Sequence, residues 1–266
     1  MTALPLSSVF LIGSRRSLRL VERNLYVYRH GWMVILSGFF EPLFYLLGVG
    51  FGVGALVGSV LGPDGTKIPY QLFVAPALLA SASMNGALNE STFNFFFKLN
   101  YDKTFAAILA TPLSSGDIAV GELTWALIRG GLYAIGFMAV MVVFGLAVSP
   151  WVVFAVPAAL LVGLAFGAVG MAATSFMKTW QDFDLIQLVV LPLFLFSGTF
   201  YPIETYPEAI RWIVQVTPLY QGVDLIRSLA VGAISPVLLV HVAYLLAMGA
   251  IGLFVVSRRI DRLLLQ

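Results

Sequence analysis

Long apolar runs separated by short polar stretches dominate the pattern along the chain. A helix that crosses a membrane needs about 20 consecutive, mostly apolar residues. Six runs meet this requirement or come close to it, at roughly residues 32–54, 70–90, 118–148, 152–177, 185–201 and 237–257. Ser and Asn residues dilute the second run, and the fifth is short. The pattern predicts an all-α polytopic membrane protein with six transmembrane helices.

The stretch between the fifth and the last run is not an ordinary polar loop. Two short amphipathic segments, 206–216 and 219–229, follow a Gly and a Pro and are separated by Thr217-Pro218. Irregular backbone at membrane depth is tolerated only where it is buried in protein or lines a polar cavity. We therefore predict re-entrant helices over residues 202–232 that line or gate a path. The alternative is an outer loop that merely rests on the membrane.

Polar side chains form a stripe along each of these two segments. In a helix, the first segment carries Glu208, Arg211 and Gln215 on one face. The second carries Gln221, Asp224 and Arg227 on one face. Trp212 and Tyr220 are of the aromatic kinds that are enriched at membrane–water interfaces. Each segment is therefore expected to lie half-inserted at the outer leaflet, with its polar stripe toward water or cargo.

The composition agrees with a membrane protein that forms one domain. Hydrophobic residues make up 60% of the chain and charged residues 11%, whereas a soluble domain has about 45–50% and about 25%. A length of 266 residues leaves no room for a second globular unit, so we expect one transmembrane domain over 1–266. The net charge of +2 is scattered, which argues against a nucleic-acid partner.

Lys and Arg are distributed unevenly between the two sides of the predicted spans. One side carries eleven of them and the other three, and Arg129 lies inside a span. The eleven are Arg15, Arg16, Arg19, Arg23, Arg29, Lys98, Lys103, Lys178, Arg258, Arg259 and Arg262, and the three are Lys67, Arg211 and Arg227. Because cytoplasmic loops are rich in Lys and Arg, we predict a multi-pass protein of the inner (plasma) membrane with both termini cytoplasmic.

An interfacial helix is predicted within residues 1–31, before the first span. Its apolar and basic positions recur at helical spacing on different faces: Leu18, Val21, Leu25 and Tyr28 on one, Arg16, Arg19 and Arg23 on another. A basic amphipathic helix of this kind lies among the lipid headgroups, with its cations near anionic lipid. The alternative is that the segment only sets the topology.

The largest predicted cytoplasmic loop spans residues 93–117. Within it Tyr101, Phe105 and Ile108 fall on one helical face, and a Thr-Pro step ends this helix. Ser114 and an Asp three residues later then form a capping box that begins the third span. A short amphipathic helix at this place suits docking into a groove of a partner. Packing on the membrane or on the base of the protein itself is the equal alternative.

Two ionisable residues, Glu41 and Arg129, lie inside predicted spans. Such residues are costly in lipid and usually face the protein interior. Counted from the cytoplasmic ends of their spans at about 1.5 Å per residue, both lie roughly 14–17 Å deep. We predict that they pair, within one chain or across a dimer, in a structural role more than a substrate-binding one. The alternative partner of Arg129 is Glu122 on its own helix.

Motifs for nucleotide hydrolysis and for other catalysis are missing from the sequence. It contains no Gly-x-x-x-x-Gly-Lys-Ser/Thr phosphate loop and no His-Glu-x-x-His zinc motif. Asp182 and Asp184 resemble the metal-binding acidic pair of some transferases, and that alternative predicts metal dependence. They fit better as caps of the fifth span, because negative charge is favourable at a helix N-terminus. We predict no catalytic residue and no metal site.

Three parts of the chain together resemble a known family. They are residues 41–48 (EPLFYLLG), residues 101–112 with their Ala-Thr-Pro ending, and residues 195–203 followed by 217–227. Over essentially its whole length the chain is similar to the permease subunits of type-2 ABC exporters, above all the nodulation-type lipo-oligosaccharide exporters and the daunorubicin-type drug exporters.

The resemblance implies partners and site residues as well as a fold. Such permeases pair as dimers, here expected to be homodimers, and bind two copies of a separate ABC ATPase. The ATPase binds ATP and Mg, so the permease itself holds no cofactor. By position, the ATPase would contact a coupling helix through Tyr101, Asp102, Lys103, Phe105 and Ile108. An outer gate would contain Glu208, Arg211, Trp212, Tyr220, Asp224 and Arg227.

The resulting hypothesis is an ATP-driven exporter permease that moves an amphipathic substrate outward across the plasma membrane. A lipid-linked saccharide or glycolipid is the first choice of substrate, and a hydrophobic drug is the second. The alternative from another class is a self-contained ion-coupled carrier or channel that uses Glu41 and Arg129. That alternative predicts transport without ATP and without a partner.

Overall fold

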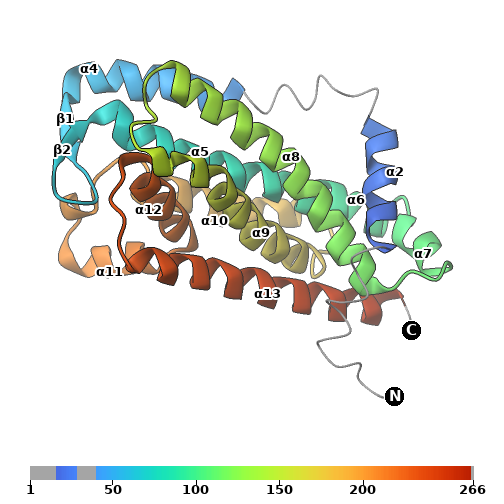
Figure 1. Ribbon diagram of the computed structural model, residues 1–266. Coiled ribbons are helices and arrows are strands. Elements are labelled where there is room, and N and C mark those ends of the chain that lie inside the picture. Colours follow the sequence, from blue (N-terminus) through green and yellow to red (C-terminus); the bar gives the residue numbers. More distant parts are fainter. Residues whose placement is uncertain (1–15, 29–39, 265–266) are drawn as a thin grey trace.

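The computed structural model describes residues 16–28 and 40–264. Most of these residues are helical, and the long helices run side by side as a bundle (Figure 1). The helical elements are α2 (Leu18–Tyr28), a π-helical turn (Leu46–Val53) continued by α4 (Gly54–Val57), α5 (Tyr70–Asn89), η2 (Glu90–Asn94), α6 (Phe95–Asn100), α7 (Thr104–Leu109), α8 (Ser115–Val143), η3 (Pro150–Phe154), α9 (Ala155–Thr174), η4 (Trp180–Asp182), α10 (Phe183–Phe196), η5 (Ile203–Thr205), α11 (Glu208–Val216), α12 (Pro218–Val231) and α13 (Val237–Leu264).

Five helices within the described residues are long and apolar enough to cross a membrane. They are Phe40–Val57, Tyr70–Asn100, Ser115–Val143, Pro150–Thr174 and Val237–Leu264. Each coincides with a predicted span, although residues 32–39 of the first predicted span lie outside the described part of the chain. The prediction of an all-α, multi-pass membrane protein is confirmed.

The fifth predicted span is shorter in the structure than the sequence suggested. It corresponds to α10, which has 14 residues and a length of about 21 Å, against about 30 Å for the hydrocarbon core. The helix stops because Gly198 adopts a φ of +70°, a left-handed conformation that glycine tolerates best. Only Phe183 of α10 is buried, so the helix lies at the periphery of the bundle.

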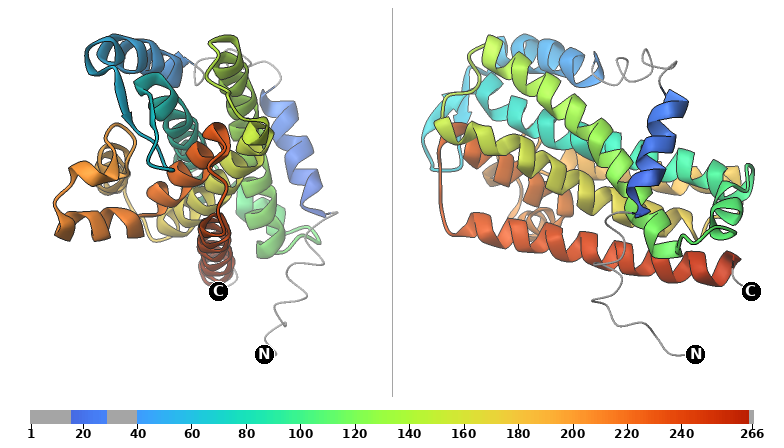
Figure 2. Two further views of the ribbon diagram at one scale, coloured as in Figure 1. Left: turned by 60° about the vertical axis from the view of Figure 1, so that its left-hand side comes forward. Right: turned by 45° about the vertical axis from the view of Figure 1, so that its right-hand side comes forward.

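The two ends of the bundle carry different elements (Figure 1). At one end, here called the hairpin end, the antiparallel strands β1 (Ser59–Leu61) and β2 (Lys67–Pro69) form a small hairpin, and α11 projects to one side of the bundle (Figure 2). At the other, here called the α7 end, lie α6, α7 and the last turns of α13. Helix α2 crosses the long helices near this end instead of following them (Figure 1). An orientation across the bundle is what an interfacial helix requires.

Small residues allow the long helices to approach one another closely. A side chain at Gly252 of α13 would lie 2.7 Å from the backbone of Ala168 in α9, and one at Gly167 would lie 2.8 Å from Leu123 in α8. Small residues at helix contacts are the usual means of packing in membranes, where van der Waals contact and not the hydrophobic effect drives association. Helix α9 is therefore the central element, with α5, α8 and α13 around it.

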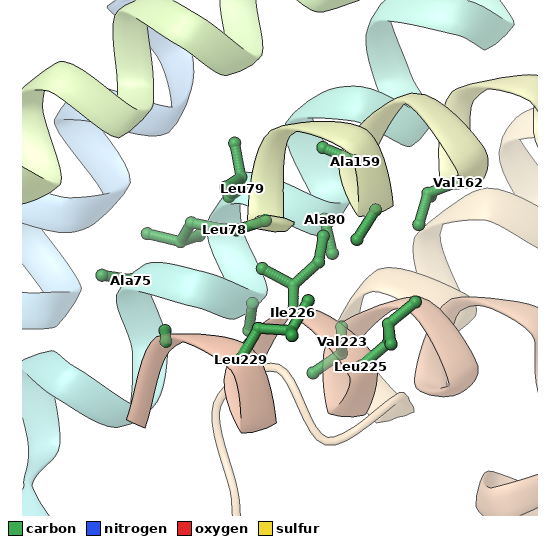
Figure 3. Packing of buried hydrophobic residues seen from close by; sticks show 14 of the residues in the cluster. Ala75, Leu78, Leu79, Ala80, Ala159, Val162, Val223, Leu225, Ile226 and Leu229 are labelled. Carbon is green, nitrogen blue, oxygen red and sulfur yellow. The ribbon is translucent and has the colours of Figure 1, made fainter. Parts of the chain in front are cut away.

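Helix α12 belongs to the core of the hairpin end. Val223 and Ile226 are fully buried and lie against α5 and α9, near Leu79 and Val162 (Figure 3). Gly222 permits the contact, because a Cβ there would lie 2.5 Å from Val162. The two amphipathic segments predicted after the fifth span are thus both helices, but only α12 is inserted among the long helices.

Candidate functional site

Helix α7, the predicted coupling helix, is anchored to the bundle by one aromatic side chain. Phe105 is fully buried, with its ring centroid 5.0 Å from that of Phe95. It lies in a cluster that also contains Leu20 of α2 and Ile118 of α8. The prediction that Phe105 is a surface contact for a partner is therefore wrong for this structure, since its ring faces the bundle.

The opposite side of the same segment is open to solvent. Tyr101 is 62% exposed, Asp102 and Lys103 are also exposed, and Ile108 is half-buried. Lys103 has a φ of +49°, so the backbone turns sharply just before α7. The candidate surface for a partner, here called the α7 surface, consists of Tyr101, Asp102, Lys103, Ala106 and Ala107.

The neighbours of α7 are held in place by polar contacts. Ser114 and Asp117 form the predicted capping box at the start of α8, with the Ser114 Oγ accepting from the Asp117 N–H at 3.2 Å. The Arg16 guanidinium donates to the Pro112 carbonyl oxygen at 3.0 Å, which ties the α2 segment to the loop after α7. Both flanks of the α7 surface are therefore connected to helices of the bundle.

Helix α2 is amphipathic, as predicted, but its buried face differs from the predicted one. Leu20, Val21 and Asn24 are buried, whereas Leu18 and Leu25 are about half exposed. The buried face packs on α8 at Gly121, where a Cβ would come within 2.7 Å of Leu20. The helix therefore packs on protein with one face, and the described residues leave a second apolar face, with Leu18 and Leu25, about half exposed.

Two buried ion pairs join α8 to the helix that runs from α5 through η2 to α6. Arg129 binds Glu90 and also donates to the Tyr133 hydroxyl at 3.2 Å. Lys98 lies 2.6 Å from Glu122. Side-chain exposure is 13% for Arg129 and 2% for Glu90. We call these four residues the ion-pair ladder, because the two pairs lie one above the other along antiparallel helices.

Residues of α2 complete this ladder. Asn24 accepts from the Lys98 ammonium at 3.2 Å and contacts Glu122 at 3.4 Å. The Arg129 guanidinium lies 5.1 Å from the centroid of the Tyr28 ring, and the Tyr28 hydroxyl accepts from the Asn94 amide at 2.8 Å. Burial raises the pKa of Tyr28, with the nearby Glu90 carboxylate adding to the effect. Helices α2, α6 and α8 are thus fastened together directly above the α7 surface.

The partner of Arg129 within this chain is therefore Glu90, and neither predicted partner takes that position. Glu122 binds Lys98, and Glu41 makes no ion pair with Arg129. Glu41 and Arg129 do line the same cavity, which has a volume of about 260 Å³. The sequence contained a signal that could have found the ladder. Glu90, Asn94 and Lys98 are spaced by four residues and so share one helix face.

The six predicted gate residues occupy very different environments. Glu208 and Trp212 of α11 are exposed, and Trp212 is 67% exposed. Arg211 donates to the Glu204 carbonyl oxygen at 3.2 Å and so holds α11 to the turn before it. Tyr220 is partly buried against Gly198. Of the polar stripe predicted on α11, Glu208 is exposed and Arg211 and Gln215 are partly buried. On α12 the predicted stripe toward water is wrong, since Gln221 and Arg227 are buried.

Arg227 is buried and acts as a structural link. Its Nε donates to the Phe73 carbonyl oxygen at 2.9 Å, and Nη2 donates to that of Gly198 at 2.7 Å. The guanidinium carbon lies 3.6 Å from the centroid of the Phe73 ring. The Tyr70 hydroxyl donates to the Phe200 carbonyl oxygen at 3.1 Å. Together these bonds fasten the turn after α10 to α5 and α12.

A buried histidine that the sequence analysis did not select joins α12 to α13. His241 is 4% exposed. Its Nδ1 contacts the Gln221 side-chain oxygen, and its Nε2 lies 3.0 Å from the Asp224 carboxylate. The side chains of Gln221 and Asp224 are therefore used within the protein and do not face outer water as predicted. Only a contact between segments far apart in sequence reveals this cluster.

Asp182 caps the helix that continues into α10. Its carboxylate accepts from the Lys178 and Thr179 N–H groups at 2.8 and 3.0 Å. These backbone hydrogen bonds hold the pKa of Asp182 below its ordinary value. The described residues bring no three His, Cys, Asp or Glu side chains together as a metal site.

These observations define the class of the protein as a multi-pass, all-helical membrane protein with a small anchored helix exposed at one end. The family model for the ABC-2 type transporter matches residues 17–231. The chain therefore belongs to the ABC-2 type transporter family, and it is a transport permease of that family.

Similar proteins agree with this assignment. The chain is 33% identical to nodulation protein J of Rhizobium leguminosarum bv. viciae over 199 residues. This aligned region covers 74% of this chain and 75% of that protein. The chain is 32% identical over 209 residues to nodulation protein J of Rhizobium meliloti, which covers 78% and 76%. The inner membrane transport permease YadH of Escherichia coli is 26% identical over 168 residues, or 62% of this chain and 64% of that protein.

Proposed function

We propose that this chain is the transmembrane subunit of an ATP-driven exporter and that a separate ABC ATPase binds the α7 surface. ATP and Mg are bound by two copies of the ATPase, and a second copy of this chain completes the transporter. The substrate is amphipathic, with a lipid-linked saccharide or glycolipid favoured over a hydrophobic drug. Both termini lie in the cytoplasm, as the distribution of Lys and Arg predicts.

The construction of the α7 end is the observation that supports this proposal most. A six-residue helix presents Tyr101, Asp102 and Lys103 outward and inserts Phe105 inward. Phe105 contacts the cluster that contains Ile118 at the start of α8. A push on the α7 surface is therefore transmitted to α8 through a fully buried ring. This is the arrangement that a partner ATPase needs to move spans without entering the membrane.

The ion-pair ladder would transmit that motion from α8 to the helices paired with it. It fixes α8, α6 and α2 to one another immediately next to α7. A buried ion pair strongly resists separation of its partners, because an unpaired charge in the interior costs about 3–5 kcal/mol. We propose that these helices move as one body when the ATPase closes on ATP, and that the path between two copies of the chain then changes its exposure.

Co-purification from the native cell tests the proposed partnership. We expect an ABC ATPase to be recovered with the native chain and to be lost with the double variant Tyr101→Asp, Lys103→Glu. Both positions are exposed, so the variant should fold. Lys67→Glu, on the exposed hairpin at the opposite end, is the matched control and should retain the ATPase. Failure to recover any ATPase after crosslinking in native membranes would refute the proposal.

The ion-coupled carrier remains the alternative, and its charged residues are placed less favourably for it than the sequence suggested. Arg129 is already neutralised by Glu90, so it offers no free charge to a transported ion. The carrier predicts that proteoliposomes with this chain alone transport an ion or a co-substrate, and that Glu41→Gln abolishes the transport. The exporter predicts no net transport by the chain alone.

A further inference from the structure

A polar cavity lies among four helices, next to the ion-pair ladder. Arg129 of the ladder is one of its lining residues. The cavity has a volume of about 260 Å³ and is lined by residues of the first span (Phe40–Val57) and of α5, α8 and α10. A complete drug-sized ligand needs about 300–1,000 Å³. The cavity is therefore large enough for one head group and too small for a whole substrate molecule.

Three polar side chains that face the cavity have no hydrogen-bond partner among the described residues. They are the amides of Asn85 and Asn89 and the carboxylate of Glu41. Ser81, Asn85 and Asn89 follow one another at four-residue spacing along one face of α5. Polar groups at membrane depth without partners are costly and usually mark a substrate path. Gly86, on the same face, lies close to the Tyr133 ring: a Cβ at this position would lie 3.3 Å from it.

A shallow, open apolar hollow, lined by one face of the first span alone, adjoins the polar cavity and shares two residues with it. Phe40, Phe44 and Val49 line the hollow, together with Glu41 and Tyr45, which also line the polar cavity. The Phe40 and Phe44 rings stack with centroids 6.0 Å apart. Tyr45 lines both spaces, and its ring meets that of Phe194, which lines the polar cavity, edge-on with centroids 5.4 Å apart. A polar space that continues into an apolar one suits a molecule with a head and a tail.

The charges around the cavity limit the kind of head group. Arg129 and Glu90 neutralise each other, and the remaining Arg129 donors bind Tyr133 or are buried. Because Glu90 compensates Arg129, Glu41 is left as an uncompensated negative charge at the cavity. At partly buried sites, like charges a few ångströms apart repel by several kcal/mol. A phosphate or carboxylate head is therefore disfavoured, and hydroxyl groups are favoured because they can donate to Glu41 and both amide oxygens.

We propose that these two hollows form a binding site for one amphiphile, with an uncharged, hydroxyl-rich head group in the polar cavity and the start of its alkyl tail in the apolar hollow. The head group binds Asn85, Asn89 and Glu41, and the tail lies along Phe40 and Phe44. The site holds the substrate of the exporter proposed above, and it narrows that substrate to glycolipid-like molecules without a phosphate in the bound head.

Photo-crosslinking to the full chain in native-membrane discs, free of glycosidic detergent, tests the site. The probe is dodecyl glucoside with a diazirine on the sugar, and the labelled peptides are mapped by mass spectrometry. We expect saturable labelling next to Tyr45 and Asn85. Unlabelled dodecyl glucoside should compete at least about tenfold better than dodecyl phosphate. Free glucose should compete more weakly still, because it lacks the tail.

Three variants separate a built site from general partition into lipid. Asn85→Leu removes the amide at similar volume and should reduce labelling about tenfold. Asn100→Leu, the same change at the end of α6 outside the cavity, should leave labelling unchanged. Glu41→Gln should remove the discrimination against dodecyl phosphate. Unsaturable labelling, equal competition by the phosphate in the native chain, or full labelling of a folded Asn85→Leu variant would each overturn the proposal.

The binding measurement does not depend on the ATPase. If labelling is saturable and selective for the glucoside but no ATPase co-purifies with the chain, the binding site is supported and only the exporter proposal is refuted. An ATPase partner without such labelling would retain the exporter and refute the site.

Discussion

At the scale of single residues, position in the fold determines what each charged side chain does. Glu90 and Arg129 are both buried and compensate each other, whereas Glu41 faces a cavity and has no such partner. Asp182 is partly exposed and serves as a helix cap. The three carboxylates have the same chemistry but should respond very differently to substitution.

Neutralising Glu90 should destabilise the protein far more than neutralising Glu41. Glu90→Gln leaves the Arg129 charge buried without compensation, which costs about 3–5 kcal/mol. Glu41→Gln removes no pair and should change stability by less than about 0.5 kcal/mol. Thermal unfolding in nanodiscs measures both, and the double change Glu90→Leu with Arg129→Leu should recover part of the loss. Equal effects of the two single variants would contradict the ion-pair ladder.

Acidification should weaken the cap at Asp182. Its pKa is depressed in the folded protein, so the stabilisation is fully present above the ordinary Asp pKa of about 3.9. It is lost as the pH falls from that value through the folded pKa. Hydrogen exchange of the first amides of α10 should therefore accelerate below about pH 4. Asp182→Asn should remove most of that pH dependence, and an unchanged profile in this variant would show that another group is responsible.

At the scale of helices, glycine positions distinguish the inserted elements from the peripheral ones. Gly222 of α12 meets Val162 directly, whereas the space around Gly130 in α8 is open for at least 4 Å. Neither glycine has a positive φ. Alanine is therefore compatible with the backbone at both sites but fits only one of them.

Replacing Gly222 by alanine should destabilise the protein by about 1–3 kcal/mol through overpacking against α9. The same change at Gly130 should be neutral, or should stabilise by about 0.5–1 kcal/mol, because alanine loses less backbone entropy in a helix. Unfolding of the two variants in nanodiscs gives a direct comparison. If Gly222→Ala is as stable as Gly130→Ala, then α12 is not packed among α5 and α9.

At the scale of the whole molecule, the two ends of the bundle should face opposite sides of the membrane. The chain contains no cysteine, so a single introduced thiol reports one position. Lys103→Cys at the α7 end should react with an impermeant maleimide only in opened cells, and Asp64→Cys in the hairpin should react in intact cells. Both residues are exposed. The reverse pattern would invert the orientation, and with it the proposed place of the ATPase.

The fold was largely predictable because the membrane restricts what a chain can do. Bilayer thickness sets the length of an apolar run, and five of the six predicted spans are long enough in the described structure. The exception, α10, depends on Gly198, whose left-handed backbone ends the helix early. The functional residues were less predictable. Phe105 and Ile108 share a helical face in sequence, but only packing shows that the Phe105 ring points into the bundle.

The sequence by itself determined the class of the protein, its spans and the short helices, because these depend on local hydrophobicity and on backbone rules that act within a few residues. It also determined the capping box at Ser114 and Asp117. Tertiary structure alone decided the partners of the charged groups. Arg129 reaches Glu90 across 39 positions, and His241 reaches Asp224 across 17. Such pairs form because buried charge and polar groups must find compensation wherever packing brings them together, and no local pattern specifies that meeting.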